Sequence, residues 1–89
     1  MANFNPKTMK NLIRFSMGVA HQIDCGIKSG RIGSSNKDKH SEICEFLRKY
    51  KNELSRDYNV NVSNILKTPK QKDFVVSLIE CKLDVLMAL

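Results

Sequence analysis

The chain of 89 residues carries a formal charge of +6, from 15 basic and nine acidic side chains, and 42% of its residues are hydrophobic. This length allows one hydrophobic core, so we expect a single domain over residues 1–89, and the hydrophobic fraction argues against a disordered chain. The moderate positive charge favours association with acidic partners or nucleic acid without distinguishing between them.

The cysteines and the N-terminal residues indicate a cytoplasmic protein. Residues 1–10 lack the apolar segment of a secretory signal, and no apolar run is long enough to span a membrane. The three cysteines, Cys25, Cys44 and Cys81, are widely spaced and odd in number, and no CxxC pair occurs. We therefore expect reduced cysteines that act as small hydrophobic side chains, and no disulfide framework.

A first helix is predicted from Pro6 to just before Gly30. Asn5 is a suitable N-cap, proline is favoured at the first helical position, and glycine commonly follows a helix end. The apolar face of this helix advances in three- and four-residue steps through Met9, Leu12, Ile13, Val19, Ala20, Ile23 and Ile27. Phe15 and Met17 lie off this stripe, so we expect the helix to be apolar on a second side as well.

A polar connection over residues 30–37 leads to a second predicted helix, which ends at about Arg56. Ser35, with Asp38 three residues later, is a variant capping box at its start. The apolar seam of this helix repeats at three- and four-residue intervals and consists of His40, Ile43, Leu47, Tyr50 and Leu54. Residues 57–62 then break the helical pattern, and we expect an extended linker there because no second strand is evident.

A short helical turn and a long final helix are predicted after this linker. Ser63 is expected to cap a turn through residues 64–67, and residues 68–71 form a capping box with proline at the first position of a helix over about 69–88. Apolar residues line two neighbouring sides of this helix, namely Val75, Ile79, Leu83 and Leu86 on one and Phe74, Leu78, Cys81 and Val85 on the other. Together the elements predict an all-α fold, a small bundle of three main helices plus one short helical turn.

No catalytic, metal or cofactor site is predicted. His21 precedes Cys25 by four residues and His40 precedes Cys44 by the same interval, but a zinc site needs about four converging ligands and this is not a familiar finger spacing. No motif joins a nucleophile to a histidine base, and residues 30–35 lack the preceding strand and the GK pair of a P-loop. We therefore expect no enzymatic activity and no small-molecule substrate.

Two groups of basic residues are candidates for contact with an anion or a nucleic acid. The first surrounds the connection before the second helix and consists of Lys28, Arg31, Lys37 and Lys39. The second lies at the start of the last helix, where cations oppose the helix dipole, and consists of Lys67, Lys70 and Lys72. Tyr58 is the one aromatic residue near basic side chains that the predicted seam leaves available for stacking.

The expected function is protein binding by a non-catalytic regulator or adaptor, including self-association into a homo-oligomer. Its predicted partner surface consists of the apolar residues in excess of one core, namely Phe15, Met17, Phe74, Leu78, Val85 and Met87. The alternative is a basic nucleic-acid-binding protein that uses phosphate contacts from the lysine clusters. In composition and length the chain is similar to small accessory proteins of large bacteriophages, which would fit a host- or virus-directed regulator.

Overall fold

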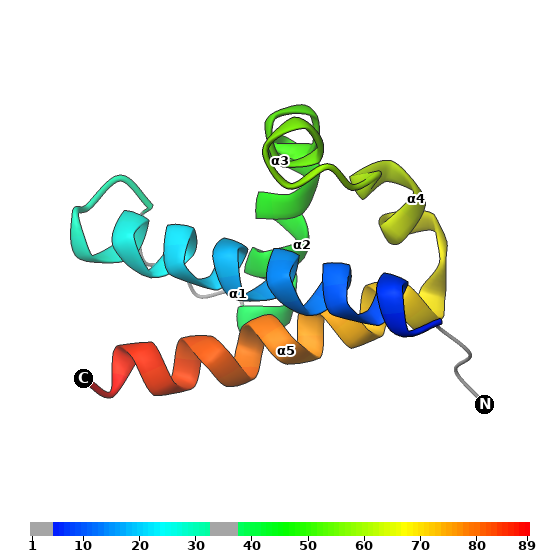
Figure 1. The fold of residues 1–89 in the computed structure, drawn as a ribbon. Helices are drawn as coiled ribbons and strands as arrows, with labels where there is room; N and C mark the ends of the chain where they lie inside the picture. Colours follow the sequence, from blue (N-terminus) through cyan, green and yellow to red (C-terminus); the bar gives the residue numbers. More distant parts are fainter. Residues whose placement is uncertain (1–4, 33–37) are drawn as a thin grey trace.

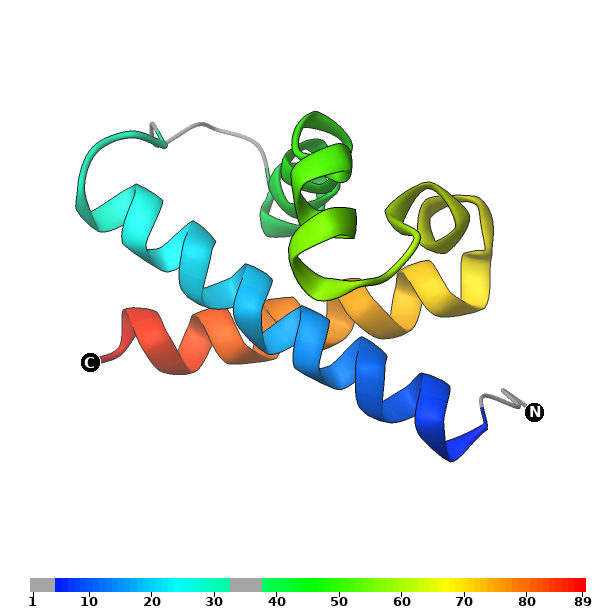
Figure 2. The same ribbon diagram turned by 45° about the horizontal axis from the view of Figure 1, so that its top comes forward.

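The computed structural model describes residues 5–32 and 38–89, which form five helices and no strand (Figure 1). The helices are α1 (Pro6–Lys28), α2 (Lys39–Lys49), α3 (Lys51–Tyr58), α4 (Val62–Lys67) and α5 (Pro69–Met87). The two long helices, α1 and α5, cross one another, and the three shorter helices gather above α5 in both views (Figures 1 and 2). The predicted all-α class is confirmed.

One apolar core joins all five helices. Each helix contributes side chains that are almost completely buried, among them Phe15, Leu47, Leu54, Val62 and Ile79. The contact between α1 and α5 is the most extensive of any pair of helices. Because burying one such side chain contributes roughly 1.5–3 kcal/mol, each helix depends on its neighbours for much of its stability.

α1 begins and ends where the sequence predicts. The Asn5 side chain accepts a hydrogen bond from the Thr8 backbone N–H at 2.7 Å, and Pro6 is the first helical residue. Beyond Lys28 the chain turns at Gly30, whose φ of 82° lies in the left-handed region that glycine adopts without strain. Residues at the two ends, and not distant contacts, therefore determine the extent of α1.

The buried face of α1 is rotated relative to the predicted one. Phe15, which we expected on the surface, is completely buried and packs edge-on against Tyr58, with ring centroids 5.6 Å apart. Met9 and Ile13, which we expected in the core, are 38% and 41% exposed. These three expectations were wrong. The Tyr58 ring of α3 packs on the Phe15 side of α1, so the buried side depends on a residue far along the chain.

The second predicted helix is divided in two. α2 ends at Lys49 and α3 starts at Lys51, and Tyr50 between them has φ −108° and ψ 21°, outside helical geometry. No glycine or proline marks this position, so the local sequence carries no signal for the break. α3 buries Leu54 in the core and places the Tyr58 ring against Phe15 of α1.

α2 is capped by Asp38 itself. One Asp38 carboxylate oxygen accepts a hydrogen bond from the Ser41 backbone N–H at 2.7 Å. Ser35, which we expected to provide the cap, lies outside the described residues. His40, which we placed in the apolar seam, is exposed, whereas Ile43 and Leu47 are buried as predicted.

The connection between α3 and α4 is shorter than the predicted linker, because α3 continues through Tyr58 and α4 already begins at Val62. Asn59 adopts a left-handed conformation with φ 54°, and the Asn61 side chain caps α4 by accepting from the Asn64 backbone N–H at 3.0 Å. The expected cap at Ser63 was therefore wrong by two positions. Asparagine suits both tasks, since it tolerates the left-handed region and is a favoured N-cap.

α5 starts at Pro69 with Thr68 in the N-cap position, as predicted, but the Thr68 side chain makes no capping hydrogen bond. The Thr68 carbonyl instead accepts from the Lys72 backbone N–H at 2.9 Å. The first predicted apolar face of this helix is confirmed, because the buried residues of α5 include Val75, Ile79, Leu83 and Leu86.

Candidate functional site

The second apolar side of α5 remains partly exposed. We call it the α5 stripe, and it consists of Phe74, Leu78, Cys81 and Val85. The 4-3-4 spacing of these residues places them along one side of the helix, next to the buried face. Val85 is 56% exposed and Cys81 is exposed, while Phe74 and Leu78 are half-buried, and Phe74 packs against the core.

The other residues of the predicted partner surface are not part of this stripe. Met87 is 48% exposed, but it follows Val85 by two residues and so points to the opposite side of α5. Met17 is half-buried, and Phe15 lies inside the core, where it has no access to a partner. Met9 and Ile13 add exposed apolar area on α1 that the sequence did not assign to the surface.

Two of the lysines predicted to contact an anion, Lys28 and Lys39, interact with groups of the chain itself, and each links α5 to another helix. Lys28 Nζ lies 3.1 Å from Asp24 Oδ2 and donates a hydrogen bond to the Leu86 backbone oxygen at 3.3 Å. Lys39 pairs with the carboxylate of Asp84. Lys37 lies outside the described part of the chain. The first basic group therefore does not present a uniform cationic surface.

The second basic group is also divided by the fold. Lys67 and Lys70 are exposed at the junction of α4 and α5. Lys72 is half-buried and lines a hollow of about 590 Å³ beside α2, together with Arg48 and two acidic residues, Asp38 and Glu45. The mixed charges of this hollow give it no preference for anions, so the three lysines do not act as one cluster.

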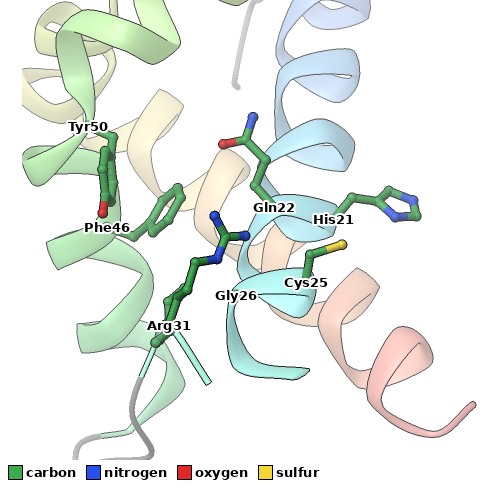
Figure 3. Close-up of a pocket in the computed structure, with 8 residues that line it drawn as sticks. His21, Gln22, Cys25, Gly26, Arg31, Phe46 and Tyr50 are labelled. Carbon is green, nitrogen blue, oxygen red and sulfur yellow. The ribbon is translucent and has the colours of Figure 1, made fainter. Parts of the chain in front are cut away.

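A groove between α1 and α2 brings together residues that the sequence did not connect. It has a volume of about 410 Å³, and the residues that line it are His21, Gln22, Cys25, Gly26, Arg31, Ile32, Phe46 and Tyr50 (Figure 3). Arg31 belongs to the first basic group, whereas we had assigned Tyr50 to the seam and given Phe46 no role. The available signal was the four-residue spacing of Phe46 and Tyr50, which places both rings on one face of a helix.

The aromatic wall of this groove is well defined. The rings of Phe46 and Tyr50 lie 4.7 Å apart between centroids, with an angle of 47° between their planes. Lys49 Nζ lies 5.4 Å from the centroid of the Tyr50 ring, within the range of a cation–π contact. Two cations of the chain, Lys49 and Arg31, therefore flank this aromatic pair.

The opposite wall comes from α1 and the turn that follows it. Arg31 Nε donates a hydrogen bond to Ser29 Oγ at 3.1 Å, and the Gln22 side-chain nitrogen donates to the Tyr58 hydroxyl at 3.1 Å. Figure 3 shows the Arg31 guanidinium directed toward Phe46 and Gln22, whereas the His21 ring points away from the groove. The polar groups near the middle of the groove are thus a guanidinium and an amide.

The histidines and cysteines are distributed over α1, α2 and α5. Cys44 Sγ lies 3.8 Å from His40 Nδ1, while His21 and Cys25 are both exposed. Within residues 5–32 and 38–89, no three His, Cys, Asp or Glu side chains are placed to hold a metal ion.

Asp38 has an electrostatic role in folding. The Ser41 backbone N–H donates to Asp38 and holds the pKa of this carboxyl below its ordinary value of 3.8. This shift is what a charged N-cap produces, because hydrogen bonds to the carboxylate favour its ionised form.

None of the helices described is both long and apolar enough to cross a membrane. The structure thus presents two candidate surfaces, the α5 stripe and the groove between α1 and α2, and comparison with known proteins transfers no residue role to either. The chain matches no protein-family model, and no curated protein and no solved structure is similar to it.

Proposed function

We propose that this chain is a non-catalytic adaptor or regulator that binds another helical protein surface through the α5 stripe, with a second copy of the chain as the first partner to test. The observation that carries this proposal is that α5 has apolar residues on two sides, and that within residues 5–32 and 38–89 one side is buried whereas the other is half-buried at Phe74 and Leu78 and exposed at Cys81 and Val85. Helices with two apolar sides are typical of elements shared between subunits or with a partner.

The spacing of the stripe suits a helix as its partner. Residues at 4-3-4 intervals form a straight seam against a second helix, the pattern of two-helix packing in coiled coils. Leu78 and Val85 would lose their remaining contact with water in such a complex, and full burial of one such side chain is worth roughly 1.5–3 kcal/mol. In a symmetric pair of stripes, Cys81 would lie close to its counterpart because it is near the middle of the seam.

The test compares Val85→Asp with Met87→Asp by light scattering across a range of protein concentrations. Both changes put a carboxylate at an exposed apolar position near the end of α5, but on opposite sides of the helix. We expect the wild type and Met87→Asp to form dimers at high concentration and Val85→Asp to stay monomeric, with equal helical circular dichroism for all three. Equal association of both variants would contradict a role for the stripe.

A cross-linking experiment tests the same interface directly. Cys25 and Cys81 are exposed and Cys44 is buried, so Cys25→Ser leaves Cys81 as the one exposed thiol. Under mild oxidation we expect a disulfide-linked dimer from Cys25→Ser and none from Cys81→Ser. A dimer that forms through Cys25 instead would place the interface on α1 and remove the support for the stripe.

A further inference from the structure

The groove between α1 and α2 combines aromatic rings with positive charge, and none of the described residues that line it is acidic. The residues that form it include Phe46 and Tyr50 on one wall and Arg31 on the other (Figure 3). Lys49 adds a second cation beside the Tyr50 ring. A ligand that fits these walls carries a flat, apolar ring and a negative charge.

From this combination we infer that the groove binds one nucleotide unit of a single-stranded nucleic acid. The base lies against the Phe46–Tyr50 pair, and the phosphate lies beside Arg31. Stacking on aromatic side chains combined with a basic groove is the general basis of sequence-tolerant single-strand binding. This site is separate from the α5 stripe, so the inference does not rest on the proposed function.

The size and shape of the groove favour a strand over a free nucleotide. Its volume of about 410 Å³ is within the range of about 300–1,000 Å³ that ligand sites occupy. However, four of its lining residues, His21, Gln22, Cys25 and Arg31, are exposed to solvent, whereas pockets for small molecules usually enclose most of the ligand surface. An open groove lets a chain of nucleotides enter and leave on either side of the bound unit.

The residues that carry the site are available for contact. Arg31 is exposed, and Phe46 and Tyr50 are half-buried, so each aromatic ring is supported by the core while part of it still faces solvent. Phe46 lies in the last turn of α2, and Tyr50 is the residue between α2 and α3. The break between the two helices therefore lies at the aromatic wall of the groove.

Intrinsic fluorescence gives a direct readout of stacking. The chain has two tyrosines and no tryptophan, so the full-length Tyr58→Phe variant contains Tyr50 as its sole strong emitter. Titration of this variant with single-stranded oligo(dT) or oligo(U) at low salt, corrected for absorption by the bases, reports contact at Tyr50. We expect quenching that saturates with added oligonucleotide and that diminishes as salt increases.

Two variants that each remove one positive charge, at different places, distinguish binding in the groove from general attraction of nucleic acid to a basic protein. Arg31→Gln and Arg14→Gln each remove one exposed guanidinium from the chain, the first at the groove and the second near the middle of α1. We expect Arg31→Gln to weaken oligonucleotide binding about tenfold and Arg14→Gln to change it less than about twofold at the same salt concentration. Binding of these variants is measured by the anisotropy of a labelled oligonucleotide. We expect Tyr50→Phe to retain the affinity of the wild type, and Tyr50→Leu to weaken binding at least about fivefold because the ring is removed.

Three results would overturn the inference. Equal losses for Arg31→Gln and Arg14→Gln, with no quenching of Tyr50, would show non-specific charge attraction. Displacement of the oligonucleotide by the same concentration of uridine monophosphate would assign the groove to a free nucleotide. Displacement by an equal concentration of an acidic peptide containing tryptophan would assign it to a protein partner. Circular dichroism of every variant checks that the fold is retained.

Discussion

Gly18 of α1 lies against the ring of Tyr58 in α3, so closely that a β-carbon at position 18 would overlap the Tyr58 hydroxyl oxygen. The same ring packs edge-on against Phe15, and its hydroxyl accepts a hydrogen bond from the Gln22 side chain. Three residues on successive turns of α1 therefore hold one aromatic side chain of α3. The absence of a side chain at Gly18 is what lets α3 approach α1.

We predict that Gly18→Ala destabilises the protein by about 1–3 kcal/mol, the usual range for inserting an atom into a packed contact. Helix propensity alone predicts the opposite sign, since alanine stabilises an exposed helix interior by about 1 kcal/mol relative to glycine. Urea unfolding followed by circular dichroism measures the difference. An increase in stability would show that the Tyr58 ring moves aside at little cost.

The same substitution in a Tyr58→Ala background provides the control. Without the ring, the added methyl group meets no close atom of Tyr58, so Gly18→Ala should now stabilise by up to about 1 kcal/mol through helix propensity. A change of sign between the two backgrounds measures the coupling between these positions. Equal effects in both backgrounds would mean that the contact has no energetic weight.

Leu47→Asp is expected to unfold the chain. Leu47 is completely buried in α2, and an unpaired carboxylate in an apolar core costs about 4–5 kcal/mol or more, close to the whole stability of a small domain. Loss of helical circular dichroism at room temperature is the measurement. Asn52→Asp, which places the same residue at an exposed position of α3, should leave the spectrum unchanged.

The three cysteines should differ in their reaction with a thiol reagent. Cys25 and Cys81 are exposed and Cys44 is 4% exposed, so two thiols should react rapidly in the native protein at low concentration and the third only after denaturation. If α5 stripes pair, the reaction of Cys81 should slow as the protein concentration rises. Three equally fast thiols would contradict the burial of Cys44, and a total below three in denaturant would reveal a disulfide.

The Asp38 cap predicts a pH dependence of stability. Because the folded-state pKa is held below the ordinary value of 3.8, the ionised cap stabilises α2 above that pH, and this contribution is lost as the pH falls through the folded pKa. Asparagine is a comparable N-cap without a charge. The Tm of the wild type should therefore fall relative to that of Asp38→Asn as the pH is lowered from about 5 to about 2. A constant difference would mean that the charge of Asp38 adds nothing to the cap.

Both ends of α1, the start of α5 and the buried side of α5 were predictable from the sequence. These features depend on residues within a few positions of one another. Asn5 and Gly30 determine where the chain enters and leaves α1, Pro69 starts α5, and Val75 and Ile79 repeat with the period of a helix. No distant contact is needed for any of them.

The break at Tyr50, the burial of Phe15 and the groove beside Arg31 were not predictable in the same way. Each depends on which side of one helix another helix covers, and this rests on packing between residues far apart in the sequence, such as Phe15 with Tyr58. Helical periodicity shows that α1 is apolar on more than one side, but it cannot say which side α3 will meet. The sequence alone therefore determines the helical class and several helix ends, while packing between distant segments determines which apolar residues remain exposed, because burial is a property of pairs of surfaces and not of one helix.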